Sequence, residues 1–336
     1  MQTIITTQPQ SIPIGCNELT TADSTARFTK QLAAGVILMA TADTDVLWTA
    51  LAAKPPVFIR HIMPVHHTLP VTCQEGDLLP LADAALALGH LLGQGSFSVQ
   101  TRLLGERFPY TASHINNLLA ERLTAMGLAL NVKEPESVLS VVCTDTTAYL
   151  GVGTSAQQLS RWPGGNIRFA AGDERISRAE FKLLEAADVF GLELFRGWAL
   201  DLGAAPGGFT RVLRQMGNSV VAIDPAVLDE RLADDPQVVH HKITAQAYFA
   251  TQPKARFGVI VNDMKMDYRE SVHIMLQAAD YLQPDGVAIM TLKLPQARQQ
   301  HNVQQALEML GRKYVIKGAR QLFHNRSEVT VACLGK

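Results

Sequence analysis

Two acids flank a glycine-rich stretch in the second half of the sequence, and this arrangement can bind a nucleoside. Asp201 ends an apolar run and is followed by Gly203-Ala204-Ala205-Pro206-Gly207-Gly208, and Asp224 ends the next apolar run. Glycines allow the backbone to approach a ligand closely. An acid placed like Asp224 can accept hydrogen bonds from both hydroxyls of a ribose. A tight strand-to-helix turn without a ligand is the structural alternative.

The spacing of this stretch argues against the common phosphate-binding loops. It reads GxxxGG rather than GxGxxG, and no lysine follows it as in a Walker loop. S-adenosylmethionine has no phosphate, only an adenine, a ribose and a charged amino acid. A glycine-rich loop beside acids therefore suits that cofactor better than it suits NAD.

Two lysines and two acids in this half are candidates for proton transfer. Asp263 and Lys293 each follow an apolar run, at the carboxyl end of an expected strand, where α/β sheets place their chemistry. Glu328 begins the last β-rich run. Taken singly, each of these residues is more often a solvated surface group.

Lys182 lies where a helix is expected to begin. Ser177 and Glu180 have the SxxE spacing of a capping box, which predicts a helix that starts at Ser177 and presents Lys182 in its second turn. A lysine acts as a base only if its pKa falls from about 10.4 toward neutrality. A second lysine nearby and partial burial both lower that pKa, because each disfavours the charged form. Two lysines together therefore favour abstraction of a proton from a hydroxyl.

The elements that must position these residues alternate between strand and helix from about residue 190 onward. The expected strands are 198–202, 219–223, 258–261 and 287–292, and the expected helices are 208–217, 268–283 and 297–311. This alternation predicts an α/β fold with a doubly wound, mainly parallel sheet. Two short β-rich runs, 313–316 and 328–333, predict a closing hairpin.

The first half of the sequence is less regular. Expected helices are 26–35, 43–53 and 112–126, and expected strands are 57–65, 137–144 and 148–152. The stretch WPGGNIRFAAGD at residues 162–173 predicts a loop or linker, because its proline and paired glycines oppose both helix and strand.

The motifs of the second half resemble the FtsJ-type family of RNA ribose methyltransferases. DLGAAPGGF is preceded by SRAEFKLLEA and followed by NDMK, TLKLP and RSEVTV. The resemblance covers about residues 174–336 and implies a Rossmann-like methyltransferase domain. It also implies a catalytic tetrad of Lys182, Asp263, Lys293 and Glu328. KLP and ARQLFHNRSEVTV further resemble the bacterial subfamily that methylates a cytidine ribose in 23S rRNA, the large-subunit methyltransferases M.

The resemblance also implies roles for these residues. Lys293 is expected to be the base, with Lys182 and Glu328 setting its charge state and orienting the ribose, and Asp263 holding the lysines and the methyl-donor end of the cofactor. The residues expected to contact S-adenosylmethionine are Ser177, Asp201, Gly203, Ala205, Pro206, Gly207, Gly208, Phe209, Asp224 and Asp263. One departure is the stretch HHKITAQAYF, which lacks the acid that often contacts adenine, so that Thr244 is the candidate substitute.

The first half resembles RNA-modifying enzymes more loosely. FSVQTRL at 97–103 and AYLG at 148–151 resemble a THUMP domain, an RNA-binding module that a ferredoxin-like domain commonly precedes. The expected division is a ferredoxin-like domain at 1–75, a THUMP-like domain at 76–165 and the methyltransferase domain at 166–336. Candidate phosphate contacts are Arg102, Arg107, Arg122, Arg161, Lys265, Arg320 and Arg326.

Composition sets limits on these expectations. The chain has 336 residues, of which 47% are hydrophobic and 18% charged, which predicts globular domains. A net charge of −1 does not favour a nucleic-acid partner, so contact with 23S rRNA would require a local basic patch. Dispersed cysteines, a polar N-terminus and no long apolar run predict a cytoplasmic protein without a membrane partner. We expect no metal, because adjacent histidines on one strand point to opposite faces.

Three alternatives remain open from the sequence alone. The same tetrad could methylate tRNA or another RNA. The fold could serve a non-catalytic RNA-binding factor in ribosome assembly, although such a factor has no need of paired lysines. A small-molecule methyltransferase would leave the large first half without a purpose.

Overall fold

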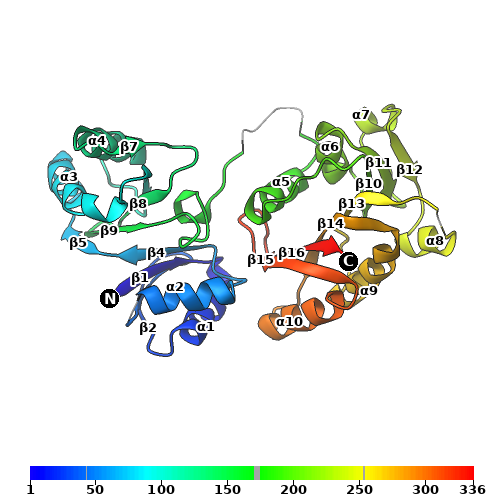
Figure 1. Cartoon of the computed structure of the whole chain (residues 1–336), viewed down its shortest axis with the longest axis horizontal. Coiled ribbons are helices and arrows are strands. Elements are labelled where there is room, and N and C mark those ends of the chain that lie inside the picture. The colour runs from blue at the N-terminus through cyan, green and yellow to red at the C-terminus, as the bar shows by residue number, and fades with distance from the viewer. Residues whose placement is uncertain (43, 170–174, 253) are drawn as a thin grey trace. The chain divides into compact units, whose positions relative to one another are not determined.

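The computed structural model of the chain describes residues 1–42, 44–169, 175–252 and 254–336 (Figure 1). The chain forms two compact units, residues 1–167 and 168–336. Of the expected linker, residues 170–173 lie outside the described residues, and Pro163–Gly165 form a short 3-10 helix. Among the described residues, no helix is both long and apolar enough to cross a membrane.

The N-terminal unit begins with a four-stranded antiparallel sheet in the order β2-β3-β1-β4. Along the chain its elements follow one another as strand-helix-strand-strand-helix-strand, which is the order of ferredoxin-like folds. Its elements are β1 (Gln2–Thr6), α1 (Ile12–Ala22), β2 (Arg27–Ala33), β3 (Val36–Ala40), α2 (Thr44–Ala53) and β4 (His61–Val65).

Two expectations for this sheet are wrong. The helix expected at 26–35 is strand β2, because Gly35, at a φ of +75°, turns the chain back into β3 and lets the two strands pair. The strand expected at 57–65 begins only at His61. Upstream of it, the backbone N–H groups of Val57, Phe58 and Ile59 donate to the Glu18 carboxylate and not to a neighbouring strand.

A second, five-stranded sheet in the order β5-β9-β8-β6-β7 completes the N-terminal unit. Its elements are β5 (His67–Pro70), α3 (Leu78–Ala87), β6 (Ser96–Leu103), α4 (Ala112–Ala125), β7 (Ala129–Leu130), β8 (Ser137–Cys143) and β9 (Thr147–Gly153). The expected pairing of the last two strands is confirmed, because β8 and β9 are antiparallel. The division of this half into two separate domains stays a prediction.

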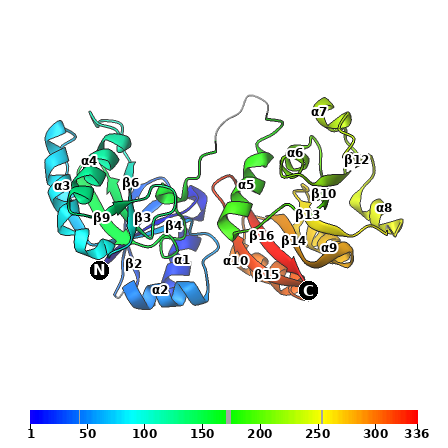
Figure 2. The same cartoon turned by 45° about the horizontal axis from the view of Figure 1, so that its top comes forward.

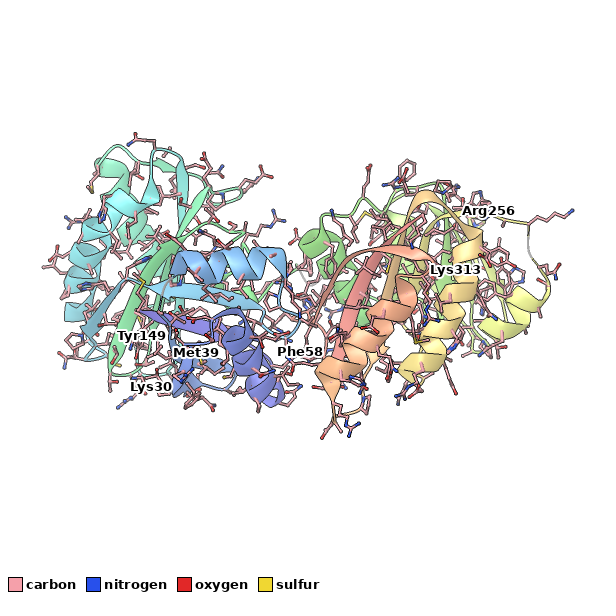
Figure 3. The ribbon with its side chains drawn as sticks, turned by 60° about the horizontal axis from the view of Figure 1, so that its bottom comes forward. Lys30, Met39, Phe58, Tyr149, Arg256 and Lys313 are labelled. Carbon is pink, nitrogen blue, oxygen red and sulfur yellow. The ribbon has the colours of Figure 1, made fainter. Side chains whose placement is uncertain are left out.

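The two sheets of the N-terminal unit pack on each other. Ile4, Leu38 and Met63 of the first sheet share a buried cluster with Val142 and Tyr149 of the second. The Lys30 ammonium lies 5.7 Å from the centre of the Tyr149 ring, and both residues are labelled in Figure 3. Apolar contact and one cation–π contact thus join the sheets.

The C-terminal unit is built on a seven-stranded sheet in the order β12-β11-β10-β13-β14-β16-β15. The first five strands are parallel, and β16 is antiparallel to both of its neighbours. The expected Rossmann-like sheet and terminal hairpin are therefore confirmed. The strands are β10 (Trp198–Leu202), β11 (Ser219–Ile223), β12 (Val238–His241), β13 (Phe257–Asn262), β14 (Leu282–Lys293), β15 (Tyr314–Arg320) and β16 (Glu328–Gly335).

Helices cover both faces of this sheet (Figures 1 and 2). They are α5 (Ala179–Phe190), α6 (Gly208–Gln215), α7 (Glu230–Ala233), α8 (Ala245–Ala250), α9 (Tyr268–Ala278) and α10 (Gln299–Leu310). The pair α5 and α6 packs Leu183, Phe209 and Val212 onto Val259 and Val261 of β13. The pair α9 and α10 lies on the opposite face in both views.

Candidate active site

The acids and lysines predicted for the site gather at one edge of the C-terminal sheet. Strands β10, β11, β13 and β14 are parallel, so their carboxyl ends meet at the same edge. Asp201 lies near the end of β10, Asp224 follows β11, Asp263 follows β13, and Lys293 ends β14. Glu328, the first residue of the antiparallel strand β16, pairs in register with Lys293.

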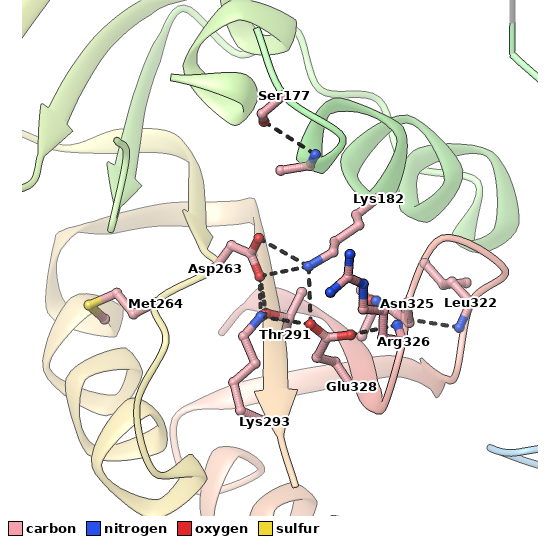
Figure 4. A network of polar contacts seen from close by, with 12 residues as sticks. Ser177, Lys182, Asp263, Met264, Thr291, Lys293, Leu322, Asn325, Arg326 and Glu328 are labelled. Atoms are coloured by element: carbon pink, nitrogen blue, oxygen red, sulfur yellow. Dashed lines mark hydrogen bonds and ion pairs between the residues drawn. The ribbon is translucent and has the colours of Figure 1, made fainter. Parts of the chain in front are cut away.

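The four residues of the predicted tetrad form one connected network (Figure 4). Lys182 Nζ lies 3.2 Å from Asp263 Oδ2 and 3.3 Å from Glu328 Oε1. Lys293 Nζ contacts Asp263 Oδ1 and lies 3.5 Å from Glu328 Oε1. Each carboxylate therefore contacts both ammonium groups, and each ammonium group contacts both carboxylates. The structure brings together residues that lie up to 146 positions apart in the sequence.

The two carboxylates of the network are held in their ionised form. Burial raises the pKa of Asp263, but the positive charges of Lys293 and Lys182 outweigh burial and hold that pKa below its ordinary value. Burial likewise raises the pKa of Glu328, whereas the same two lysines and a hydrogen bond from the Arg326 backbone lower it more strongly. The four side chains thus carry two positive and two negative charges in a partly buried place, with exposed fractions of 13% to 20%.

Thr291 belongs to this network and was not predicted from the sequence. Its hydroxyl donates to Asp263 Oδ1, and it accepts a hydrogen bond of 2.6 Å from Lys293 Nζ. Its side chain is only 1% exposed. Thr291 and Lys293 are two residues apart on β14, so both point to the same face of the sheet. That spacing is the signal in the sequence that would have identified Thr291.

Helix α5 begins two residues later than predicted. Its first residue is Ala179, so Lys182 lies in the first turn and not the second. The reason is that Ser177 Oγ accepts a hydrogen bond from the backbone N–H of Ala179, two residues later. In a capping box it would accept from the N–H three residues later, that of Glu180. The Glu180 carboxylate still reaches back to accept from Ile176 N at 2.7 Å and from Ser177 N at 3.4 Å. The expected residues therefore fix the start of the helix through a different set of bonds.

The glycine-rich stretch packs too closely for larger residues. Gly207 has a φ of +119°, and a Cβ atom there would lie 2.3 Å from a methyl group of Leu232. A Cβ atom on Gly208 would lie 2.2 Å from Ser177 Oγ, so the stretch touches the segment that leads into α5. Ala205 N donates to Asp224 Oδ2 at 3.1 Å, which joins the stretch to the acid after β11. The side chain of Phe209 is buried in the core.

Asp201 is buried in a different electrostatic setting. Its Oδ2 accepts a hydrogen bond of 2.7 Å from Thr210, whereas its Oδ1 is buried without a hydrogen-bond partner among the described residues. Burial, and secondarily the negative charges of Asp263 and Asp224, raise the pKa of Asp201 to about 7. Three carboxylates thus influence one another beside the glycine-rich stretch, which favours a positively charged ligand there.

The remaining candidates occupy separate places. Thr244 caps helix α8, where its hydroxyl accepts from Ala247 N. The backbone N–H of Arg326 donates to Glu328 Oε2 at 2.7 Å, so its loop is tied to the tetrad.

The candidate phosphate contacts of the N-terminal unit lie on different elements. The Arg102 guanidinium donates to Thr6 Oγ1, and Arg107 forms an exposed ion pair of 3.1 Å with Asp145. Arg122 lies in the last turn of α4, and Arg161 precedes the 3-10 helix at Pro163–Gly165. The structure therefore does not assemble these four arginines on one element.

The chain is similar in sequence to known methyltransferases. Residues 175–318 match the FtsJ-like methyltransferase family. A protein of Halorhodospira halophila named ribosomal RNA large subunit methyltransferase M is 33% identical over 63% of this chain, and the chain spans about three fifths (61%) of its length. A protein of the same name from Shewanella woodyi is 27% identical over 86% of this chain and 84% of its own length. The match to the crystal structure of TrmN from Thermus thermophilus covers 100% of this chain and 99% of the TrmN chain, at 19% identity and a TM-score of 0.41.

Proposed function

We propose, from the FtsJ-like methyltransferase domain at residues 175–318, that this chain transfers a methyl group from S-adenosylmethionine to a ribose 2′-hydroxyl of RNA. The observation that carries the proposal is the network of Lys182, Asp263, Lys293 and Glu328 at the carboxyl edge of the sheet. Two lysine side chains held in place by two carboxylates suit proton transfer from a weakly acidic hydroxyl, with one lysine in its neutral amine form as the acceptor.

The residues beside the glycine-rich stretch fit S-adenosylmethionine. Each oxygen of Asp224 accepts one backbone N–H, from Ala205 and from Ala226, and retains capacity to accept from a ribose hydroxyl. Asp201 Oδ1, which no described residue hydrogen-bonds, lies in a region of surplus negative charge. When bound, S-adenosylmethionine supplies an electrophilic methyl carbon on a positively charged sulfur, and it also carries an ammonium group. Both positive charges suit these acids.

Lys293 is the proposed base. Its Nζ lies at the end of β14 and is oriented by Asp263, Thr291 and Glu328. With both lysines charged, the tetrad is neutral, and a neutral Lys293 leaves it with one net negative charge. Lys182 then keeps both carboxylates paired while the ribose hydroxyl reacts.

The proposed substrate is a cytidine ribose of 23S rRNA, and the proposed place of action is the cytoplasm. The support is the name of the relatives, ribosomal RNA large subunit methyltransferase M, together with the motifs KLP and ARQLFHNRSEVTV. The N-terminal unit is proposed to bind RNA, because its sheets carry the THUMP-like motifs at 97–103 and 148–151.

The test is transfer of labelled methyl from S-adenosylmethionine to unmodified large-subunit rRNA, to tRNA and to assembling large subunits, followed by nuclease mapping. Label in a ribose of the rRNA that is absent with Lys293→Ala supports the proposal. Label in tRNA alone would indicate that tRNA, and not rRNA, is the substrate. No transfer to any of these, despite tight cofactor binding, would indicate a non-catalytic RNA-binding protein.

A further inference from the structure

Aromatic side chains gather beside the tetrad. The aromatic cluster consists of Phe169, Phe181, Phe323 and His324, with Arg175 over one of the rings. The centres of the Phe181 and His324 rings lie 5.0 Å apart, and those of Phe323 and His324 lie 5.1 Å apart. The Arg175 guanidinium lies 4.7 Å from the centre of the Phe181 ring.

The aromatic cluster and the tetrad share their supporting elements. Phe181 precedes Lys182 in helix α5. Phe323 and His324 lie in the loop between β15 and β16, which ends at Glu328. Figure 4 shows this loop beside α5, with Arg326 next to Glu328. One helix and one loop therefore carry residues of both the tetrad and the cluster.

The loop has two kinds of residues. Leu322 and Asn325 are each only 1% exposed and anchor the loop, with Leu322 N donating to Asn325 Oδ1 at 2.8 Å. Between them, Phe323 and His324 remain partly accessible to solvent. An aromatic pair that served only the core would be buried like its neighbours. The loop thus presents two rings while its flanking residues hold it in place.

A buried carboxylate holds the backbone of both residues and the ring of His324. Glu185 is 3% exposed on its side chain, and it accepts hydrogen bonds from Phe323 N at 2.7 Å and from His324 N at 2.9 Å. Its Oε2 also lies 2.7 Å from His324 Nδ1. One buried acid therefore holds the backbone and the ring of this part of the loop, which pre-organises a surface for a planar partner.

We propose that the aromatic cluster is a binding site for an unpaired nucleobase of RNA, adjacent to the ribose that reaches the tetrad; this rests on the proposed function. Unpaired bases are recognised by stacking on aromatic rings and on arginine guanidinium planes. Arg175 and Arg326 are exposed beside the cluster, so the surface carries positive charge that an RNA backbone would complement.

The experiment compares binding of a short unpaired oligocytidine with binding of an abasic ribose-phosphate oligomer of the same length. Wild-type protein is expected to prefer the base-bearing oligomer by on the order of tenfold. Phe323→Leu, which retains apolar volume without an aromatic ring, is expected to lose most of that preference. The matched control is Phe195→Leu, which changes an exposed phenylalanine of the same unit outside the cluster and is expected to keep the preference.

The salt dependence of binding distinguishes the contribution of the aromatic rings from that of the positive charges. Arg175→Gln is expected to reduce the slope of log affinity against log salt concentration by about 0.7, the value for one phosphate contact on a single strand. Phe323→Leu is expected to leave that slope unchanged. Equal binding of both oligomers by the wild-type protein, or an equal loss in Phe195→Leu, would overturn the proposal.

Methyl transfer distinguishes this inference from the proposed function. If Phe323→Leu raises the KM for rRNA with little change in kcat and unchanged cofactor affinity, the base-binding site is supported. If the wild-type protein prefers the base-bearing oligomer but methylates no RNA, the proposed methyl transfer is contradicted and the base-binding site is still supported. If Phe323→Leu methylates rRNA with unchanged KM, the site is overturned and the proposed function stands.

Discussion

Two carboxylates on neighbouring strands of the C-terminal sheet differ sharply in their surroundings. Asp263, after β13, contacts Lys182, Lys293 and Thr291, and its pKa lies below its ordinary value because the lysines outweigh burial. Asp201, near the end of β10, accepts one hydrogen bond from Thr210, and burial raises its pKa to about 7. Burial acts in the same direction on both acids, so the partners decide the outcome.

The difference indicates which part of the site is complete without a ligand. The charge of Asp263 is balanced by residues of the protein itself. The charge of Asp201 has no cationic partner among the described residues and is opposed by Asp224 and Asp263. The tetrad is therefore pre-organised for chemistry, whereas a positively charged ligand beside the glycine-rich stretch would favour the ionised form of Asp201.

The largest expected effect comes from changing the tetrad. Lys293→Ala is expected to lower the rate of methyl transfer about 10²- to 10⁴-fold, because it removes the proposed base. Single-turnover transfer of labelled methyl to rRNA measures the rate, and cofactor affinity is measured in parallel.

Lys293→Arg is the matched control for charge. A guanidinium can still pair with Asp263 and Glu328, but it does not lose its proton in proteins. The variant is therefore expected to keep the stability of the wild-type protein and to be as inactive as Lys293→Ala. Near wild-type activity in Lys293→Arg would exclude Lys293 as the base.

The next effect concerns Asp201 and the free energy of unfolding. Because its pKa is raised in the folded state, the folded protein binds more protons than the unfolded chain between about pH 4 and pH 7. Its stabilising contribution is thus fully present below about pH 4 and is lost as the pH rises to about 7. A rise from 3.8 to about 7, at 1.36 kcal/mol per pH unit, corresponds to about 4 kcal/mol.

Asp201→Asn is expected to remove this pH dependence. Urea unfolding of the ligand-free protein at several pH values between about 4 and 7 measures it. The variant should lose less stability than the wild-type protein as the pH rises through that window. Parallel curves for the two proteins would show that Asp201 is already ionised in the folded state at low pH.

A smaller effect is expected from Thr291. Thr291→Val keeps the shape of the side chain but removes the hydroxyl that joins Asp263 to Lys293. Leaving part of a buried polar network without its partner costs about 1–3 kcal/mol, so methyl transfer is expected to fall by roughly tenfold. Thr291→Ser retains the hydroxyl and is expected to retain most of the activity, and equal losses in both variants would indicate a packing role only.

The sequence predicted the parts of this site that depend on local order. Strands β10 and β11 were predicted with their observed bounds, because each is a mainly apolar run with an acid close to its carboxyl end. The tetrad was identified from the family motifs. Its expected positions agreed with the predicted strands, because two of its members follow strands and one begins a strand. Thr291 was missed because a threonine within an apolar run is also an ordinary strand residue.

The errors arose where distant residues decide the local structure. The segment 57–59 is not a strand because Glu18, 39 to 41 positions earlier, accepts its backbone hydrogen bonds. Strand β2 was mistaken for a helix because its pairing with β3 outweighs its local pattern. The opposite pKa directions of Asp201 and Asp263 likewise depend on neighbours from other strands, which no spacing along the chain specifies.

The smallest expected effect comes from an exposed ion pair of the same unit. Lys313 Nζ lies 2.7 Å from Asp280 Oδ1, closer than Lys182 lies to either tetrad carboxylate, but the two side chains are 41% and 67% exposed. Water screens such a pair, so Lys313→Ala is expected to change the free energy of unfolding by less than about 1 kcal/mol and to leave methyl transfer unchanged. Urea unfolding of Lys313→Ala beside Lys182→Ala compares the two. A loss in Lys313→Ala equal to that in Lys182→Ala would show that distance, and not burial within a network, determines the strength of these contacts.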